Sequence, residues 1–255
     1  MTPEALLRRL DEIGEELARR GDAIALLGLG SSGTDIDRMD EHSDLDFFAI
    51  VEDAAVPRYL ESIDWLEAVH PVAYSFRNTV DGRKALFADG IFCEYAVFGV
   101  EQLAGIAFTR GRIVWQRADA PAGLEIPRRQ PPEPDDGDAG FHVNEALTQL
   151  YVGLHRELRG ERLAAMRLIQ VHAVDRAARL LALERPDAPQ QDAFALERGI
   201  ERRFPADEFP LASFAQGYER NRESALALLA WLEEHGEVDA TLAAAVRELA
   251  SRRGA

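Results

Sequence analysis

The sequence contains one cysteine, Cys93, and one lysine, Lys84, among 255 residues. A single cysteine excludes an internal disulfide and a thiolate-rich metal site, and it agrees with a reducing compartment. Phe92 and Glu94 flank Cys93 in a strand-like run, which favours a small buried hydrophobic residue at this position. Arginine supplies nearly all the basic charge, a bias that indicates genomic base composition rather than chemistry.

Long apolar segments are also missing. No apolar run approaches the ~20 residues that a membrane-spanning helix needs. The first ten residues lack the apolar core and the small-residue cleavage site of a signal peptide. We therefore expect a cytoplasmic protein without a membrane partner.

The sequence has few basic residues: 29 lysines and arginines and 45 aspartates and glutamates give a formal net charge of −16. Phosphate backbones are bound by basic surfaces, so this balance argues against a nucleic-acid partner. It weakly favours a neutral or cationic small substrate. The 47% of hydrophobic and 29% of charged residues are ordinary for a globular protein with a sizeable core.

The first half of the chain alternates helical and strand-like patterns. Thr2 and Pro3 suit the start of a helix that ends near Arg20, and an apolar run over 23–29 predicts a strand covered on both faces. Together the elements predict a small mixed sheet with helices on it. Further strands are predicted over 45–51, 69–76, 84–87, 91–98 and 112–116, and helices over 57–66 and 101–108.

The composition changes after residue 117. Residues 118–140 are rich in proline, aspartate and glycine, which predicts a linker or an extended loop. Strand signals then disappear, so we predict an α+β protein with a sheet domain at 1–117, a linker at 118–140 and a helical bundle domain at 141–255. The predicted helices of the bundle domain cover 141–158, 161–183, 192–204, 218–235 and 239–251.

The stretch from Leu27 to Glu52 predicts a strand, a glycine-rich turn, a short helical segment and a second strand. Asp44 and Asp46 stand at the start of the second strand. Because side chains alternate along a strand, these two carboxylates are expected to point to the same side. Two neighbouring carboxylates suit a hard divalent cation, which prefers oxygen ligands.

This arrangement resembles a known superfamily. Gly30-Ser31, a spacer and Asp44-Leu45-Asp46 are similar to the Gly-Ser and Asp-x-Asp signature of the DNA polymerase β-like nucleotidyltransferases. The family has a third carboxylate on a later strand, and Glu94 stands on a predicted strand in that place. The helices that follow make the layout similar to the lincosamide and aminoglycoside antibiotic nucleotidyltransferases. The resemblance covers the sheet half by motif order and the helical half only by architecture.

The resemblance implies a catalytic and metal-binding set made of Asp44, Asp46 and Glu94. Two Mg²⁺ ions would be held by the aspartates, and Glu94 would complete one metal site or act as general base. ATP or another nucleoside triphosphate is the implied co-substrate. The three residues expected to contact the nucleotide phosphates, through a glycine-rich turn, are Gly30, Ser31 and Ser32.

Each part of this site also has a structural interpretation. Asp44 could cap the turn, and Glu94 could be a solvated strand residue. The cation that offsets the triphosphate is not identified by the pattern. Four basic residues remain unranked for that role: Arg38, Arg77, Arg83 and Lys84.

The leading hypothesis is a Mg²⁺-dependent transferase that moves a nucleoside monophosphate, AMP above all, to a hydroxyl of a small molecule such as an aminoglycoside or lincosamide. A second hypothesis keeps this chemistry but changes the acceptor to a protein, as in toxin–antitoxin systems. A third is a catalytically silent nucleotide-binding module of the same fold. The resemblance also implies that a homodimer can form.

Overall fold

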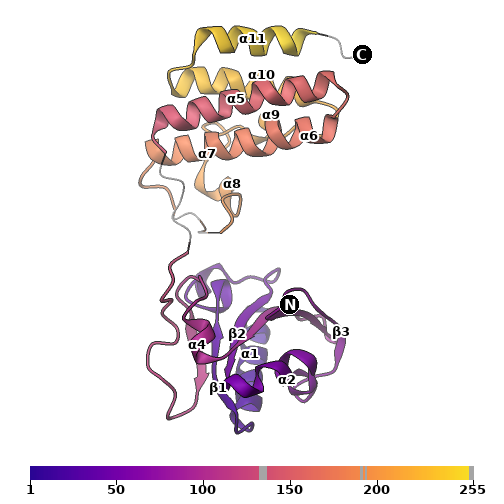
Figure 1. Ribbon diagram of the computed structural model, residues 1–255, viewed down its shortest axis with the longest axis vertical. Coiled ribbons are helices and arrows are strands. Elements are labelled where there is room, and N and C mark those ends of the chain that lie inside the picture. Colours follow the sequence, from indigo (N-terminus) through magenta and orange to yellow (C-terminus); the bar gives the residue numbers. More distant parts are fainter. Residues whose placement is uncertain (132–136, 190–191, 193, 253–255) are drawn as a thin grey trace. The chain divides into compact units, whose positions relative to one another are not determined.

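The computed structural model describes residues 1–131, 137–189, 192 and 194–252. The chain divides into two compact units, residues 1–132 and 133–255 (Figure 1). The first unit contains a mixed sheet with helices, and the described part of the second contains helices without strands. The predicted α+β class is therefore confirmed.

Six strands form the sheet of the first unit, in the order β3-β4-β5-β2-β1-β6. The pair β2–β5 is parallel, whereas the other neighbouring strands run antiparallel. The structure confirms the two strands predicted at 45–51 and 112–116, with the same bounds. The strands are β1 (Ala23–Gly28), β2 (Leu45–Val51), β3 (Val72–Arg77), β4 (Gly82–Phe87), β5 (Phe92–Phe98) and β6 (Arg112–Gln116).

Four α-helices accompany this sheet: α1 (Pro3–Ala18), α2 (Val56–Glu61), α3 (Asp64–Glu67) and α4 (Val100–Leu103). Thr2 caps α1, since its hydroxyl accepts a hydrogen bond from the Ala5 N–H at 3.3 Å. The single helix predicted over 57–66 is wrong, because Ser62 adopts an extended conformation and divides it. The helix predicted over 101–108 is also too long, because it ends at Leu103.

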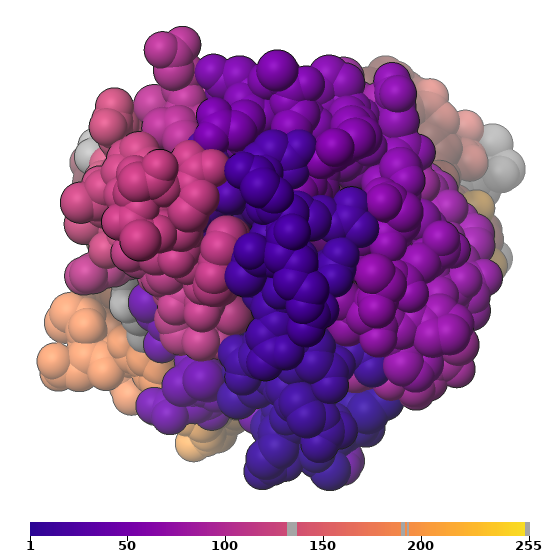
Figure 2. Space-filling model, turned by 90° about the horizontal axis from the view of Figure 1, so that it is seen from below, coloured from indigo at the N-terminus to yellow at the C-terminus, as the bar shows by residue number. Residues whose placement is uncertain are grey.

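The sheet packs on both faces. On one face, α1, α2 and α3 cover a large core in which Phe47 stacks on Tyr95 at a centroid distance of 5.2 Å and meets Trp65 edge-on at 6.3 Å. The opposite face carries a smaller core around Ile50 and Phe98. In Figure 2, the indigo N-terminal residues form a surface band between the pink and purple segments of this unit.

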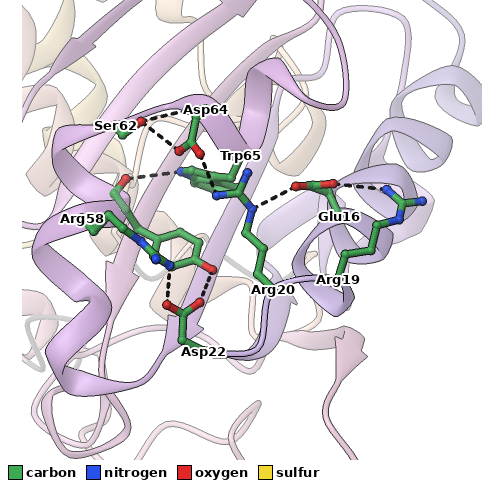
Figure 3. A network of polar contacts seen from close by, with 9 residues as sticks. Glu16, Arg19, Arg20, Asp22, Arg58, Ser62, Asp64 and Trp65 are labelled. Carbon is green, nitrogen blue, oxygen red and sulfur yellow. Dashed lines mark hydrogen bonds and ion pairs between the residues drawn. The ribbon is translucent and has the colours of Figure 1, made fainter.

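A polar network joins the end of α1 to the α2–α3 segment (Figure 3). Arg20 bonds to Glu16 and to Asp64, at 2.9 Å in both cases. Asp22 accepts hydrogen bonds from the Tyr59 hydroxyl at 2.8 Å and from Arg58. Asp22 immediately precedes β1, so this network fastens the end of the sheet that is opposite to Gly28.

Residues after β6 stay attached to the first unit. The Gly111 N–H donates to the Glu125 carbonyl at 2.9 Å, Ala107 forms a bridge with Arg129, and Leu124 is buried. The first part of the predicted linker, 118–140, thus packs against the sheet unit. Residues 132–136 of that linker lie outside the described residues.

The second unit is built from helices around one apolar core. The helix predicted over 161–183 includes a π-helical turn at Arg167–His172. The prediction over 192–204 is wrong for 194–199, where Gly199 has φ +69° and the chain turns; residue 193 lies outside the described residues. The α-helices are α5 (Ala139–Leu158), α6 (Arg162–Met166), α7 (Ala173–Glu184), α8 (Ile200–Arg203), α9 (Leu211–Phe214), α10 (Asn221–His235) and α11 (Ala240–Ser251).

Within the described part of the chain, no helix has both the length and the apolar character needed to cross a bilayer.

The core of the first unit gives a prediction for Tyr95→Phe. The Tyr95 hydroxyl is buried and has no hydrogen-bond partner among the described residues, and burial raises the pKa of this phenol. Removing an unsatisfied hydroxyl should increase the free energy of unfolding by about 1 kcal/mol near neutral pH.

The same substitution should change the alkaline behaviour. Because the pKa of Tyr95 is higher in the folded state than in the unfolded state, the folded state is favoured as long as the phenol is neutral. This contribution to the free energy of unfolding is complete below about pH 10 and is lost as the pH rises further. Urea unfolding at a series of pH values should show a shallower alkaline decline for Tyr95→Phe than for the parent chain. An equally steep decline would contradict this assignment.

Candidate active site

Three neighbouring strands place charged residues in one row across the sheet. Asp46 of β2 is the register partner of Glu94 of β5, and Glu94 is the register partner of Lys84 of β4. Register partners on adjacent strands project to the same face. Phe47 and Tyr95, the next residues along, point into the large core, so the charged row lies on the other face.

Glu94 is held by two polar partners. Lys84 Nζ lies 2.9 Å from Glu94 Oε2, and Asn78 Nδ2 donates to Glu94 Oε1 at 2.9 Å. The Glu94 side chain is 41% exposed and that of Lys84 is 34% exposed, so both remain accessible to a ligand. The hydrogen bond to Glu94 raises the pKa of Lys84, and the negative charges of Asp44 and Asp46 contribute in the same direction. Lys84 therefore lies within electrostatic range of all three carboxylates.

The glycine-rich turn lies directly beside Asp46. The Leu29 N–H donates to the Asp46 carbonyl at 2.8 Å, and Gly30 to Ser32 form a 3-10 turn. Gly30 has φ +50°, a left-handed conformation that glycine adopts without steric cost. A Cβ added to Gly30 would lie 3.9 Å from Asp46 Oδ2. The carboxylate of Asp46 thus faces the turn.

The two serines of the turn differ in their surroundings. Ser32 is fully buried; its hydroxyl accepts a hydrogen bond from the Asp46 N–H at 3.3 Å and lies 3.5 Å from the Asp44 carbonyl. Ser31 is half-buried. The Ser32 hydroxyl therefore joins the turn to the start of β2, whereas Ser31 is the serine of the pair that a ligand can reach.

Close backbone packing holds the turn in place. A Cβ on Gly28 would lie only 2.1 Å from the Ser32 carbonyl oxygen, so this approach requires glycine. Arg112 of β6 donates to the same carbonyl from Nε at 3.3 Å and from Nη2 at 3.2 Å. Sequence reasoning missed Arg112, because only the pairing of β1 with β6 brings it to the turn.

The four basic residues left unranked by sequence can now be distinguished. Arg38 pairs with Asp35 on the surface, and Arg77 bonds to backbone carbonyls of its own hairpin. Arg83 donates to the Leu60 carbonyl at 2.8 Å. Lys84 is the one of these four with an ion pair to a predicted site carboxylate.

The carboxylates suit Mg²⁺ by chemistry and by register. Asp44, Asp46 and Glu94 offer the oxygen donors that this ion prefers: Asp46 and Glu94 from adjacent strands, and Asp44 from the segment directly before β2. Among the residues that the structure describes, no three side chains of histidine, cysteine, aspartate or glutamate are gathered closely enough to hold a metal. The contacts of Glu94 with Lys84 and Asn78 mean that Glu94 must rotate before it can join the aspartates.

Comparisons with known proteins add little to this description. No family model and no curated protein matches the chain. Two solved structures are similar to it. An aminoglycoside 6-adenyltransferase from Bacillus subtilis has 15% identity and a TM-score of 0.34, covering 96% of this chain and 91% of its own. A nucleotidyltransferase-like protein from Exiguobacterium sibiricum has 13% identity and a TM-score of 0.32, covering 89% of this chain and 74% of its own.

At these identities and TM-scores, neither solved structure assigns a function to this chain.

The contrast between the two serines gives a prediction. Ser32→Ala removes a buried hydroxyl that accepts from the Asp46 N–H and donates to the Asp44 carbonyl, so the free energy of unfolding should fall by about 1–3 kcal/mol. Ser31→Ala removes a half-buried hydroxyl and should change it by less than about 0.5 kcal/mol. Urea unfolding of both variants checks this, and equal losses would show that the two serines are not distinguished as described.

Proposed function

We propose that this chain is a Mg²⁺-dependent nucleotidyltransferase that transfers a nucleoside monophosphate, AMP from ATP, to a hydroxyl of a small molecule. The observation that carries the proposal is the direct register of Asp46 with Glu94, beside the Gly30–Ser32 turn and on the exposed end of one sheet face. In this proposal the row supplies metal ligands and a proton acceptor, and the turn beside it binds phosphate.

The residues have distinct roles in this proposal. Asp44 and Asp46 would hold the Mg²⁺ ions, which supply charge stabilisation for the attacking and leaving oxygens. Ser31 binds a phosphate oxygen through its hydroxyl, while Ser32 and Arg112 keep the turn in place. Gly30 lets the phosphates approach the backbone closely beside Asp46.

Glu94 acts on the acceptor. It accepts the proton of the attacking hydroxyl as the new oxygen–phosphorus bond forms at the α-phosphorus and the bond to the bridging oxygen breaks, so that pyrophosphate leaves. General base catalysis requires hydrogen-bond reach between this carboxylate and the hydroxyl. Asn78, which bonds to one oxygen of Glu94, orients the carboxylate.

The acceptor class follows from charge. The net charge of −16 and the three site carboxylates favour a neutral or cationic acceptor over an anionic one. Aminoglycosides combine several hydroxyls with positive charge, so they are the acceptors of first choice, with lincosamides next. A protein acceptor is the second candidate, because an accessible hydroxyl on a polypeptide meets the same chemical requirement.

The direct test uses the full chain with Mg²⁺, each of the four nucleoside triphosphates, and a panel of aminoglycosides and lincosamides. Release of pyrophosphate together with a nucleotide adduct on the acceptor, identified by mass spectrometry, is the expected result. Adducts on proteins of a lysate instead would favour the protein acceptor. Calorimetry showing nucleotide binding that is independent of Mg²⁺, without turnover, would support a silent module.

Asp46→Asn gives the mechanistic prediction. The substitution keeps the shape of the side chain but removes a charged metal ligand, so we expect kcat to fall by about a thousandfold or more, with an unchanged melting temperature. Asp37→Asn, an exposed carboxylate on the neighbouring surface turn, is the matched control and should retain full activity. Turnover by Asp46→Asn at the parent rate would remove Asp46 from the metal site.

A further inference from the structure

Lys84 is the one lysine of the sequence, and it lies in the charged row of the candidate active site. Its side chain contacts Glu94 and is influenced by Asp44 and Asp46. Composition alone suggests that this lysine has no special meaning. Its ion pair with Glu94, the register partner of Asp46, is a separate observation, and it calls for a chemical explanation.

The ion pair of Lys84 with Glu94 can be exchanged for a contact with another anion. A lysine ammonium is a compact charge on a flexible stem, whereas an arginine guanidinium binds carboxylates as a rigid fork. Lys84 makes one ion pair, to Oε2 of Glu94, while Asn78 bonds to Oε1. With 34% of its side chain exposed, Lys84 can turn to another partner without opening the core.

The carboxylate of Glu94 is needed both for the ion pair with Lys84 and for its proposed role as metal ligand or proton acceptor. As a metal ligand or a proton acceptor, Glu94 must be free of Lys84, because the Lys84 ammonium occupies Oε2 of this carboxylate. An incoming triphosphate brings further negative charge to the carboxylates. The ammonium released by Glu94 is then within reach of these new anionic oxygens.

We propose that Lys84 is a phosphate-binding residue for the triphosphate of the nucleotide, held in reserve by Glu94 until ligand binding. In the ligand-free state Lys84 neutralises Glu94. When Mg²⁺ is bound, Glu94 turns toward Asp46, and the Lys84 ammonium moves to a phosphate oxygen of the nucleotide. The inference rests on the proposed function, because it requires that the row binds Mg²⁺ and a nucleoside triphosphate.

The single lysine makes this exchange measurable without an acceptor. An amine-selective acetylating reagent can modify Lys84 and the α-amine of Met1, which serves as the internal reference, and peptide mass spectrometry measures the two rates separately. Mg²⁺ alone should raise the rate at Lys84, because breaking the ion pair with Glu94 exposes the Lys84 amine to the reagent. Mg²⁺ with a non-hydrolysable ATP analogue should lower the rate at Lys84 by about tenfold, as expected for a charge-assisted contact with phosphate.

Calorimetry under the same conditions separates the role of Lys84 from the proposed function. If the analogue binds but the acetylation rate of Lys84 does not change, Lys84 is not a phosphate ligand and the inference is overturned while the proposed function stands. If neither Mg²⁺ nor the analogue binds, the proposed function fails and the inference fails with it.

Substitutions give an independent test. Lys84→Met should weaken binding of the Mg²⁺-bound analogue by about tenfold to a hundredfold, because a hydrogen bond to a charged group is lost. Arg38→Met, which removes an exposed basic residue that pairs with Asp35, is the control and should leave the affinity unchanged. Melting temperatures of both variants should match that of the parent chain.

Glu94→Gln distinguishes a reserve from a simple structural ion pair. This variant frees Lys84 in advance, so its acetylation should be fast without Mg²⁺ and should no longer respond to Mg²⁺ alone. The analogue should still protect Lys84 when Mg²⁺ is present. Loss of protection in Glu94→Gln, with binding retained, would show that Lys84 serves Glu94 and not the nucleotide.

Discussion

The parallel pairing of β2 with β5 is the constraint on which the candidate active site depends. It places Glu94 directly opposite Asp46, although a long crossover containing α2, α3 and the β3–β4 hairpin separates them in sequence. Parallel strands need such a crossover, whereas antiparallel strands can be joined by a short turn. The hairpin then adds β4 beside β5, which brings Lys84 to the other side of Glu94. The registers of β2 and β4 on β5 together therefore determine the charged row.

The contacts that stabilise the sheet unit lie away from the charged row. The network of Glu16, Arg20, Asp22 and Asp64 fastens the helices at the start of β1, and the aromatic core around Phe47 fills the face opposite the charged row. The exposed end of the other face is left with carboxylates, an ammonium and a tight turn. A half-exposed carboxylate can change partners without loss of core packing, because no apolar contact has to break.

Much of this arrangement could be predicted from local pattern. The apolar run after Asp44 predicts a strand over 45–51, and β2 has these bounds, with Asp46 on the strand and Asp44 in the segment directly before it. The polymerase-like motif order likewise suggested Glu94 as the third carboxylate. These features depend on residues that are close together in the sequence, so their spacing can be measured without knowing the fold. Helical periodicity was less reliable over 57–66 and 192–204, where an extended Ser62 and a left-handed Gly199 interrupt the helices.

The remaining features depend on strand register, which a single sequence does not specify. Arg112 reaches the Ser32 carbonyl because β6 pairs with β1, and Asn78 reaches Glu94 from the loop before β4. Neither residue belongs to a recognisable motif. The pairing of Lys84 with Glu94 likewise depends on register, here that of β4 with β5. The scarcity of lysine in the composition gave no reason to single out Lys84.

The identity of the cation at position 84 has a physical consequence. An arginine there could bind both oxygens of Glu94 at once, competing with Asn78 and holding the carboxylate through two parallel hydrogen bonds. Lysine makes a single contact and leaves the second oxygen to Asn78, so Glu94 stays oriented while its charge is neutralised. A carboxylate that has to exchange Lys84 for another partner is released more readily from one contact than from two. In a chain whose other basic side chains are arginines, position 84 carries the one cation suited to that exchange.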